Sequence, residues 1–176
     1  DKTYMVLPFM SPKVLFTCFA GRERYLRVLV PYIQTLVERR LVDEVHFWDY
    51  TRNPKDAEYI RTLPFQILEP ATKAHFGDYY EYYTCAKYPD PDTVLVKCDD
   101  DIVFIDVDRF DAFIKGRRKV PEALILSPSV INNPVCGAIQ LNRKLLPGFE
   151  RKDMDITADG ARKIHRYFLK SKKLFM

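Results

Sequence analysis

Three consecutive aspartates interrupt an apolar stretch in the middle of the chain. Residues 94–98 read Val-Leu-Val-Lys-Cys, residues 102–105 read Ile-Val-Phe-Ile, and Asp99, Asp100 and Asp101 lie between them. Such apolar runs are typical of buried strands, whereas ionised carboxylates are rarely buried unless a cation compensates them. We therefore expect one strand to end at the aspartates, a second to leave them, and the carboxylates to lie at the mouth of a cleft.

Strands and helices alternate along the rest of the chain. The apolar runs predict strands at 14–19, 44–48, 65–68, 93–98, 102–105, 123–126 and 136–141, and the helical periodicity predicts helices at 22–40, 56–61, 77–86, 107–116 and 161–168. Pro31 would kink the first helix or set its boundary, and Asp106 is placed to cap the fourth. The alternation predicts an α/β fold: a single Rossmann-like domain with a mostly parallel central sheet flanked by helices.

The length of 176 residues fits one domain, 1–176, with a substantial core. The abrupt ends at Asp1 and Met176 suggest a piece of a longer chain. No run of about eighteen apolar residues is present, so we expect no transmembrane segment. Cys18, Cys85, Cys98 and Cys136 lack Cys-x-x-Cys spacing and are expected to be reduced core residues, as in a cytoplasmic protein.

The net charge of +4 is mild. Basic residues are scattered, apart from residues 115–119 and a Lys/Arg-rich C-terminal helix. These clusters could bind a phosphate-bearing small molecule or could be solvated helix faces. Nothing in the charge distribution requires nucleic acid, and no nucleic-acid partner is expected.

Asp99 and Asp101 are separated by one residue, so both carboxylates can reach one divalent ion from the end of a strand. Mg²⁺ and Mn²⁺ suit such oxygen ligands best and usually keep positions open for substrate phosphates. The alternative is a solvated turn, but three adjacent like charges beside an apolar run cost stability unless a cation compensates them.

The same motif, with a Gly-Arg turn after the first strand, resembles the DxD glycosyltransferases of the GT-A fold. The resemblance extends to those of large algal viruses and of bacterial polysaccharide synthesis, and it covers Val14 to about Leu141. It is carried by Phe-Ala-Gly-Arg-Glu-Arg-Tyr-Leu at 19–26, Trp-Asp-Tyr-Thr-Arg-Asn at 48–53 and Val-Ile-Asn-Asn-Pro at 130–134. It implies a nucleoside-diphosphate sugar donor, with a UDP-sugar favoured, a glycan or glycoprotein acceptor, and Mn²⁺ or Mg²⁺.

In such enzymes the last aspartate of the motif ligates the metal, and the first approaches the ribose or reaches the metal through water. The resemblance thus implies Asp101 and Asp99 as metal ligands and leaves Asp100 ambiguous. The expected donor-binding residues are Thr17, Phe19, Ala20, Gly21, Arg22, Arg24, Asp49, Arg52, Lys73, Asp99 and Asp100. Arg24 could equally be a solvated residue of a first helical turn, and Asp49 a local cap.

The remaining site residues are less constrained. Asn132 and Asn133 are candidates for recognising donor or acceptor sugar hydroxyls, although asparagines in loops often just form turns. An inverting enzyme needs a carboxylate base, and Asp153 and Asp155 are the candidates for that base in an acidic segment that could equally lie on the surface. His165, a possible further metal ligand, fits a helix face better, and the tyrosines at 79, 80, 82 and 83 fit a core better than a nucleotide pocket.

Three other functions stay open. A binding module could keep the nucleotide-sugar or glycan site without catalysis. The segment Ile102-Val-Phe-Ile-Asp-Val-Asp108 resembles the opening of a haloacid-dehalogenase-type phosphatase, which implies Asp106 as nucleophile and Asp108 as acid/base. The third is a polyanion-binding protein. The sugar, the acceptor, the stereochemical course and the oligomeric state are not predicted.

Overall fold

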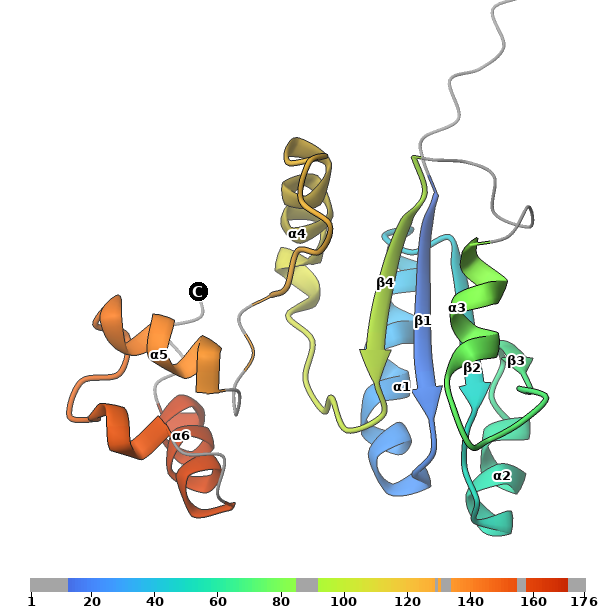
Figure 1. Ribbon diagram of the computed structural model, residues 1–176, viewed down its shortest axis with the longest axis horizontal. Coiled ribbons are helices and arrows are strands. Elements are labelled where there is room, and N and C mark those ends of the chain that lie inside the picture. Colours follow the sequence, from blue (N-terminus) through green and yellow to red (C-terminus); the bar gives the residue numbers. More distant parts are fainter. Residues whose placement is uncertain (1–12, 85–91, 129, 131–133, 155–157, 171–176) are drawn as a thin grey trace, which may run out of the picture. The chain divides into compact units, whose positions relative to one another are not determined.

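The structure is a computed structural model that describes residues 13–84, 92–128, 130, 134–154 and 158–170 (Figure 1). Residue contacts divide the chain into two compact units, Asp1–Pro121 and Glu122–Met176. We describe each unit by itself.

The first unit is built on a four-stranded, all-parallel sheet (Figure 1). Its strands are β1 (Val14–Ala20), β2 (Glu44–Asp49), β3 (Gln66–Leu68) and β4 (Val94–Asp99), in the order β3-β2-β1-β4. Its helices are α1 (Glu23–Glu38), α2 (Pro54–Arg61), α3 (Gly77–Thr84) and α4 (Val107–Lys119). The predicted α/β fold with a parallel sheet flanked by helices is confirmed.

One face of the sheet packs on α1, which lies behind it in Figure 1. Alternate residues of β1 point to this face because side chains in a strand alternate. The amphipathic helix α1 supplies the facing apolar stripe, and Ile60 of α2 and Phe110 of α4 extend the same core. The buried residues of β1 and α1 in this core are Val14, Phe16, Cys18, Ala20, Leu26, Leu29, Val30, Ile33 and Leu36.

The short helices begin where the sequence places capping residues. The Asn53 side chain accepts a hydrogen bond from the Lys55 amide, and Pro54 occupies the first turn of α2. The Asp106 side chain likewise accepts from the Arg109 amide, which confirms the predicted cap of α4.

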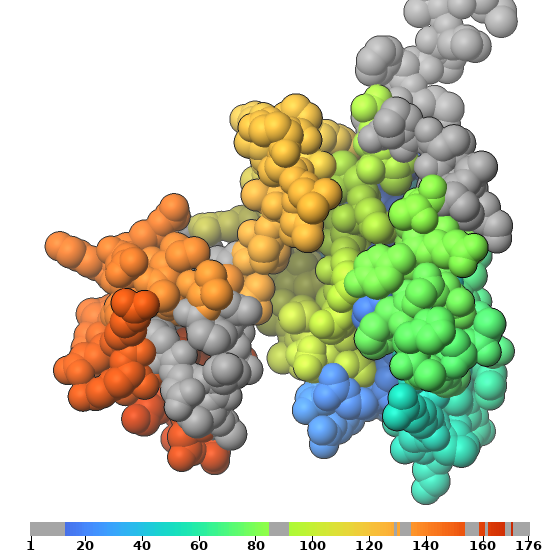
Figure 2. Space-filling view, in the orientation of Figure 1, coloured from blue at the N-terminus to red at the C-terminus, as the bar shows by residue number. Residues whose placement is uncertain are grey.

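The opposite face of the sheet is only half covered. Helix α3 packs the rings of Tyr79 and Tyr83 against Trp48 of β2, and Figure 2 shows this helix, in green, over that part of the sheet. On β4, visible beside it in yellow-green, Leu95 is 42% exposed and Lys97 is also exposed. Among the described residues of the first unit, the exposed part of this face therefore lies on the strand that leads into the aspartates.

Three predicted strands are wrong. Residues 102–105 form no strand, and Phe104 is 59% exposed because no neighbouring strand pairs with this segment. Residues 123–126 are irregular, with Leu124 91% exposed. Residues 136–141 lie within the helix α5 (Pro134–Asn142), which begins with a proline in its first turn.

The second unit contains α5, a 3-10 helix η1 (Arg151–Met154) and α6 (Ala158–Lys170), where a helix was predicted at 161–168. Its small core joins Leu146 and Ile164, with Phe149 and Tyr167 packed against them. Within the described ranges, none of the helices combines the length and apolar character needed to cross a bilayer.

Candidate functional site

The order β3-β2-β1-β4 places a topological switch between β1 and β4. From β1 the chain adds β2 and then β3 on one side, whereas β4 pairs with the other side of β1. In open parallel sheets, ligands bind outside the carboxyl ends of the strands at such a switch. Because Phe19 pairs with Asp99 and Ala20 with Asp49, the aspartates of β2 and β4 end beside the same central strand.

Asp100 is the buried member of the aspartate triplet. Its side chain is 8% exposed and binds the Arg22 guanidinium through two nitrogens, with 3.1 Å from Nε to Oδ1. A Cβ on Gly21 would approach Asp100 Oδ2 to 3.1 Å, so glycine leaves the space that the carboxylate fills. The Gly-Arg turn after β1 thus receives and neutralises the middle aspartate, which the sequence left ambiguous.

Asp99 and Asp101 flank this buried pair and face solvent, with side chains 57% and 55% exposed. Asp99 Oδ1 lies 2.8 Å from Lys97 Nζ, and Asp101 Oδ2 lies 3.2 Å from Arg22 Nη2. Hydrogen bonds and charge from Asp100, and then from Asp101, raise the pKa of Arg22 further above its ordinary value, so Arg22 stays a cation. Two exposed carboxylates with exposed counter-ions can exchange those partners for a ligand.

The donor set fits a hard divalent cation. Carboxylate oxygens are the ligands that Mg²⁺ and Mn²⁺ prefer, and these ions bind through one or two carboxylates plus substrate phosphates. Among the residues that the structure describes, no group of three or more His, Cys, Asp or Glu side chains is arranged to hold a metal ion. The two exposed carboxylates of the triplet, Asp99 and Asp101, would be the protein part of such a site. A metal would have to compete with Arg22 for Asp101.

The carboxyl end of β2 holds a buried ion pair. Asp49 is 1% exposed, and its Oδ1 accepts hydrogen bonds from Lys73 Nζ at 2.8 Å and from the Thr51 amide at 3.0 Å. Lys73 Nζ also donates to the Thr51 carbonyl at 2.7 Å, and Arg52 donates to the Lys73 carbonyl at 3.2 Å. Asp49 Oδ2 is buried and has no hydrogen-bond partner among the described residues. These contacts bring the predicted residues Asp49, Arg52 and Lys73 together.

Aromatic rings lie beside this pair, at the end of β1. The Phe19 ring stacks on Phe76 with centroids 4.9 Å apart, and Tyr50 packs edge-on against both. Phe76 is 50% exposed, and it gave no signal in the sequence because it lies in an irregular segment. By contrast, Thr17 is fully buried and accepts a hydrogen bond from the Tyr83 hydroxyl, and Ala20 is buried too.

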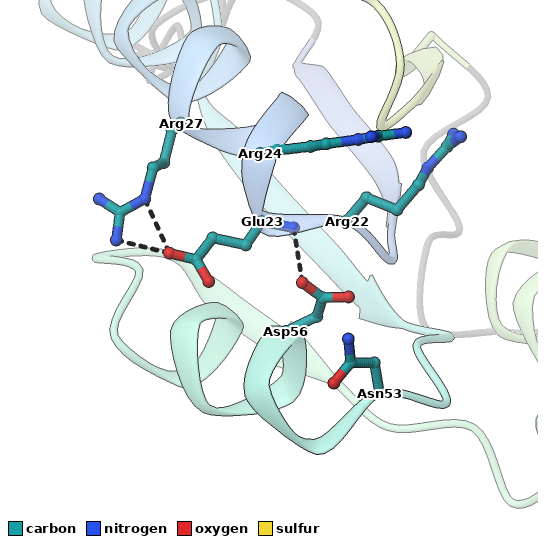
Figure 3. Close-up of a pocket in the computed structure, with 6 residues that line it drawn as sticks. All are labelled: Arg22, Glu23, Arg24, Arg27, Asn53 and Asp56. Atoms are coloured by element: carbon teal, nitrogen blue, oxygen red, sulfur yellow. Dashed lines mark hydrogen bonds and ion pairs between the residues drawn. The ribbon is translucent and has the colours of Figure 1, made fainter.

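A recess of about 490 Å³ opens at the first turns of α1 and α2. Its lining residues are Arg22, Glu23, Arg24, Arg27, Asn53 and Asp56 (Figure 3). Arg22 and Arg24 extend in the same direction, and each guanidinium lies within 5 Å of the Tyr25 ring centroid, at 4.8 and 4.5 Å. Arg22 binds Asp100, whereas the Arg24 guanidinium donates to the Tyr25 hydroxyl. Of the two predicted phosphate ligands in this recess, Arg24 is therefore the one with less acidic compensation.

The predicted sugar and base residues belong to the segment from Glu122 onward, which is the second unit. Asn132, Asn133 and Asp155 lie outside the described residues. Asp153 lies in the second unit, where Oδ2 accepts from the Glu150 amide at 2.8 Å. His165 lies on α6.

The residues of the phosphatase alternative perform structural roles. Asp106 caps α4, and Asp108, 83% exposed, pairs with Arg39 of α1. The segment before Asp106 is not a strand, although a nucleophile of that class would follow one.

Neither a protein-family model, nor a curated protein, nor a solved structure matches this chain. The arrangement of its own side chains is therefore the ground for a functional hypothesis.

Proposed function

We propose that this chain is a metal-dependent glycosyltransferase that moves a sugar from a nucleoside diphosphate, with UDP favoured, to a glycan acceptor. The observation that carries the proposal is the division of the aspartate triplet at the topological switch. The middle carboxylate is buried against Arg22, and the outer two face solvent. The charge of Asp100 is neutralised by a side chain of the protein, whereas Asp99 and Asp101 remain accessible to a bound cation.

Asp101 and Asp99 would hold Mn²⁺ or Mg²⁺, which neutralises charge on a departing diphosphate. Arg24 and the exposed side of Arg22 supply further positive charge for the phosphates. The Phe19 and Phe76 rings offer an apolar surface for a nucleotide base, beside the buried Asp49–Lys73 pair. The buried free cysteines Cys18 and Cys98 suit a reducing compartment, and we propose that the activity is cytoplasmic.

A thermal-shift panel of nucleoside diphosphates and their sugars, with and without Mn²⁺, tests the proposal. Saturation at about 100 times the dissociation constant stabilises a protein by about 2.7 kcal/mol. We expect UDP or a UDP-sugar to raise the melting temperature only when Mn²⁺ is present. Asp101→Asn should abolish that shift, and the control Asp108→Asn, which removes an exposed aspartate of the same unit, should retain it. A complete absence of metal-dependent nucleotide stabilisation would overturn the proposal.

Two further outcomes separate the alternatives. Metal-dependent UDP-sugar binding without sugar hydrolysis or transfer to any glycan would identify a binding module. Turnover of a generic phosphoester that is lost in Asp106→Asn and kept in Asp101→Asn would identify a phosphatase.

A further inference from the structure

The net positive charge of the chain originates in the second unit. Residues 122–176 hold ten of the 28 Lys and Arg residues but only five of the 24 Asp and Glu residues, so the net charge of +4 originates there. Three of those cations occur at i, i+3 and i+7 on α6, as Lys163, Arg166 and Lys170. This spacing places them on one face of the helix, over a rise of about 10 Å.

These cations line a groove of about 430 Å³ with two aromatic rings. Phe149 and Tyr167 pack edge-to-face with centroids 5.3 Å apart, and both rest on the core residues Leu146 and Ile164 while keeping part of their surface accessible. Gly148, at φ +82°, provides the left-handed turn that leads into Phe149. The packed rings thus line the groove together with the basic side chains.

One carboxylate lies within this basic groove. Asp153 is 21% exposed and its Oδ1 is 3.8 Å from Lys163 Nζ, a distance too long for a strong ion pair. An accessible carboxylate repels any nearby anionic group, but it accepts hydrogen bonds from hydroxyl groups, which a glycan carries and a polyphosphate chain lacks. The groove therefore presents cations for anionic groups, an acceptor for hydroxyls and aromatic surface for an apolar ring face.

We infer that this groove binds an anionic glycan. A sugar chain that carries carboxylate groups has all three matching features: negative charge, hydroxyl donors, and C–H faces that pack on aromatic rings. A DNA backbone offers hydroxyl donors only at its ends and RNA only one per nucleotide, fewer than a sugar chain offers to Asp153, and a flat bilayer does not enter a recess. The inference rests on the proposed transfer reaction for its biological meaning, since it then names the acceptor as an acidic glycan.

Binding of two hexasaccharides to the full chain tests the inference by calorimetry at low salt without nucleotide or metal. We expect hexagalacturonate to bind at least about tenfold more tightly than maltohexaose, which has the same length and no charge. Arg166→Gln should weaken hexagalacturonate at least about fivefold. Arg143→Gln, which removes an exposed cation of the same unit outside the groove, is the matched control and should leave the affinity unchanged.

A second variant separates a glycan site from a simple charged patch. Tyr167→Leu keeps apolar packing on Ile164 and removes the ring, so hexagalacturonate should bind more weakly while inorganic polyphosphate is unaffected. Equal affinity for the two hexasaccharides, equal loss in the two arginine variants, or tighter binding to polyphosphate or to phosphatidylglycerol vesicles would overturn the inference. If hexagalacturonate does not bind as expected but UDP with Mn²⁺ still stabilises the chain, only the inferred acceptor class is wrong. If UDP does not stabilise the chain but hexagalacturonate binds, the proposed transfer reaction is wrong and the glycan site remains.

Discussion

Two lysine–aspartate pairs of the same length lie on either side of β1 and have opposite surroundings. At the end of β2, Lys73 Nζ is 2.8 Å from Asp49, whose side chain is 1% exposed. On β4, Lys97 Nζ is also 2.8 Å from Asp99, whose side chain is 57% exposed. Leaving a charge unpaired costs much more free energy in a buried site than in an exposed one. The Lys73–Asp49 contact is therefore part of the fold, whereas the Lys97–Asp99 contact is a surface pair that can be exchanged for a ligand.

Substitution of Lys73 tests this difference between the two pairs most directly. Lys73→Met leaves the buried Asp49 carboxylate without its cation, and we expect a loss of about 2–4 kcal/mol in the free energy of unfolding, measured with urea. Lys97→Met is the matched control, with an expected loss of about 0.5 kcal/mol or less. Similar losses in the two variants would show that burial does not distinguish the pairs.

Arg22 occupies an intermediate position between these two pairs. It holds Asp100, which is buried, but its own side chain is 45% exposed, so water partly compensates the charges. We expect Arg22→Met to cost about 1–3 kcal/mol in urea unfolding with the metal chelated. Arg27→Met, which breaks an exposed i,i+4 pair with Glu23 on the same helix, should cost about 0.5 kcal/mol. A loss in Arg22→Met no greater than in this control would mean that Asp100 does not need its partner.

The β2 and β4 sides of the sheet also differ in their buried tyrosine hydroxyls, because α3 covers only the β2 side. Burial raises the pKa of Tyr79 and of Tyr83 above the ordinary value of about 10. The folded state then keeps protons that the unfolded state releases, so this stability is fully present below about pH 10 and is lost as the pH rises further. One such group changes the free energy of unfolding by up to about 1.4 kcal/mol per pH unit.

Tyr79→Phe should therefore lose less stability than the wild type between about pH 10 and pH 11.5, in urea unfolding at several pH values. Tyr80→Phe, which removes a hydroxyl from a 57% exposed ring of the same helix, is the control. If the free energy of unfolding depends on pH in the same way for Tyr79→Phe and the wild type, Tyr79 has the same pKa in the folded and unfolded states.

The sequence predicts the first unit better than the second for a physical reason. In β1, β2 and β4 an apolar run has neighbours on both sides or a helix on one face, so propensity and packing agree. The segments 102–105 and 136–141 have equally apolar compositions, but strand propensity is realised only where a partner strand is present. Neither segment pairs with a strand in the part of the chain that the structure describes. Periodicity alone does not distinguish a short buried helix from a strand.

The candidate site shows the same division. The spacing of Asp99 and Asp101 and their place at a strand end could be predicted, because strand ends meet at one edge of a parallel sheet. The burial of Asp100 could not, since it depends on the register that brings Arg22 and Gly21 next to β4. Phe76 was missed because its position depends on a loop and not on a repeating pattern.

The smallest stability effect is expected at the residue with the largest proposed functional role. Asp101 is 55% exposed, and Asp101→Asn removes both an exposed contact with Arg22 and the repulsion from two adjacent carboxylates. These effects oppose each other, so the free energy of unfolding in chelator should change by less than about 0.5 kcal/mol. The Mn²⁺ affinity, measured from the electron paramagnetic resonance signal of the free ion, should nevertheless fall at least about tenfold. A carboxylate that serves as a metal ligand contributes little to the stability of the metal-free fold. A large loss of stability in Asp101→Asn with unchanged Mn²⁺ affinity would therefore show that Asp101 is a structural carboxylate, like Asp49 and Asp100.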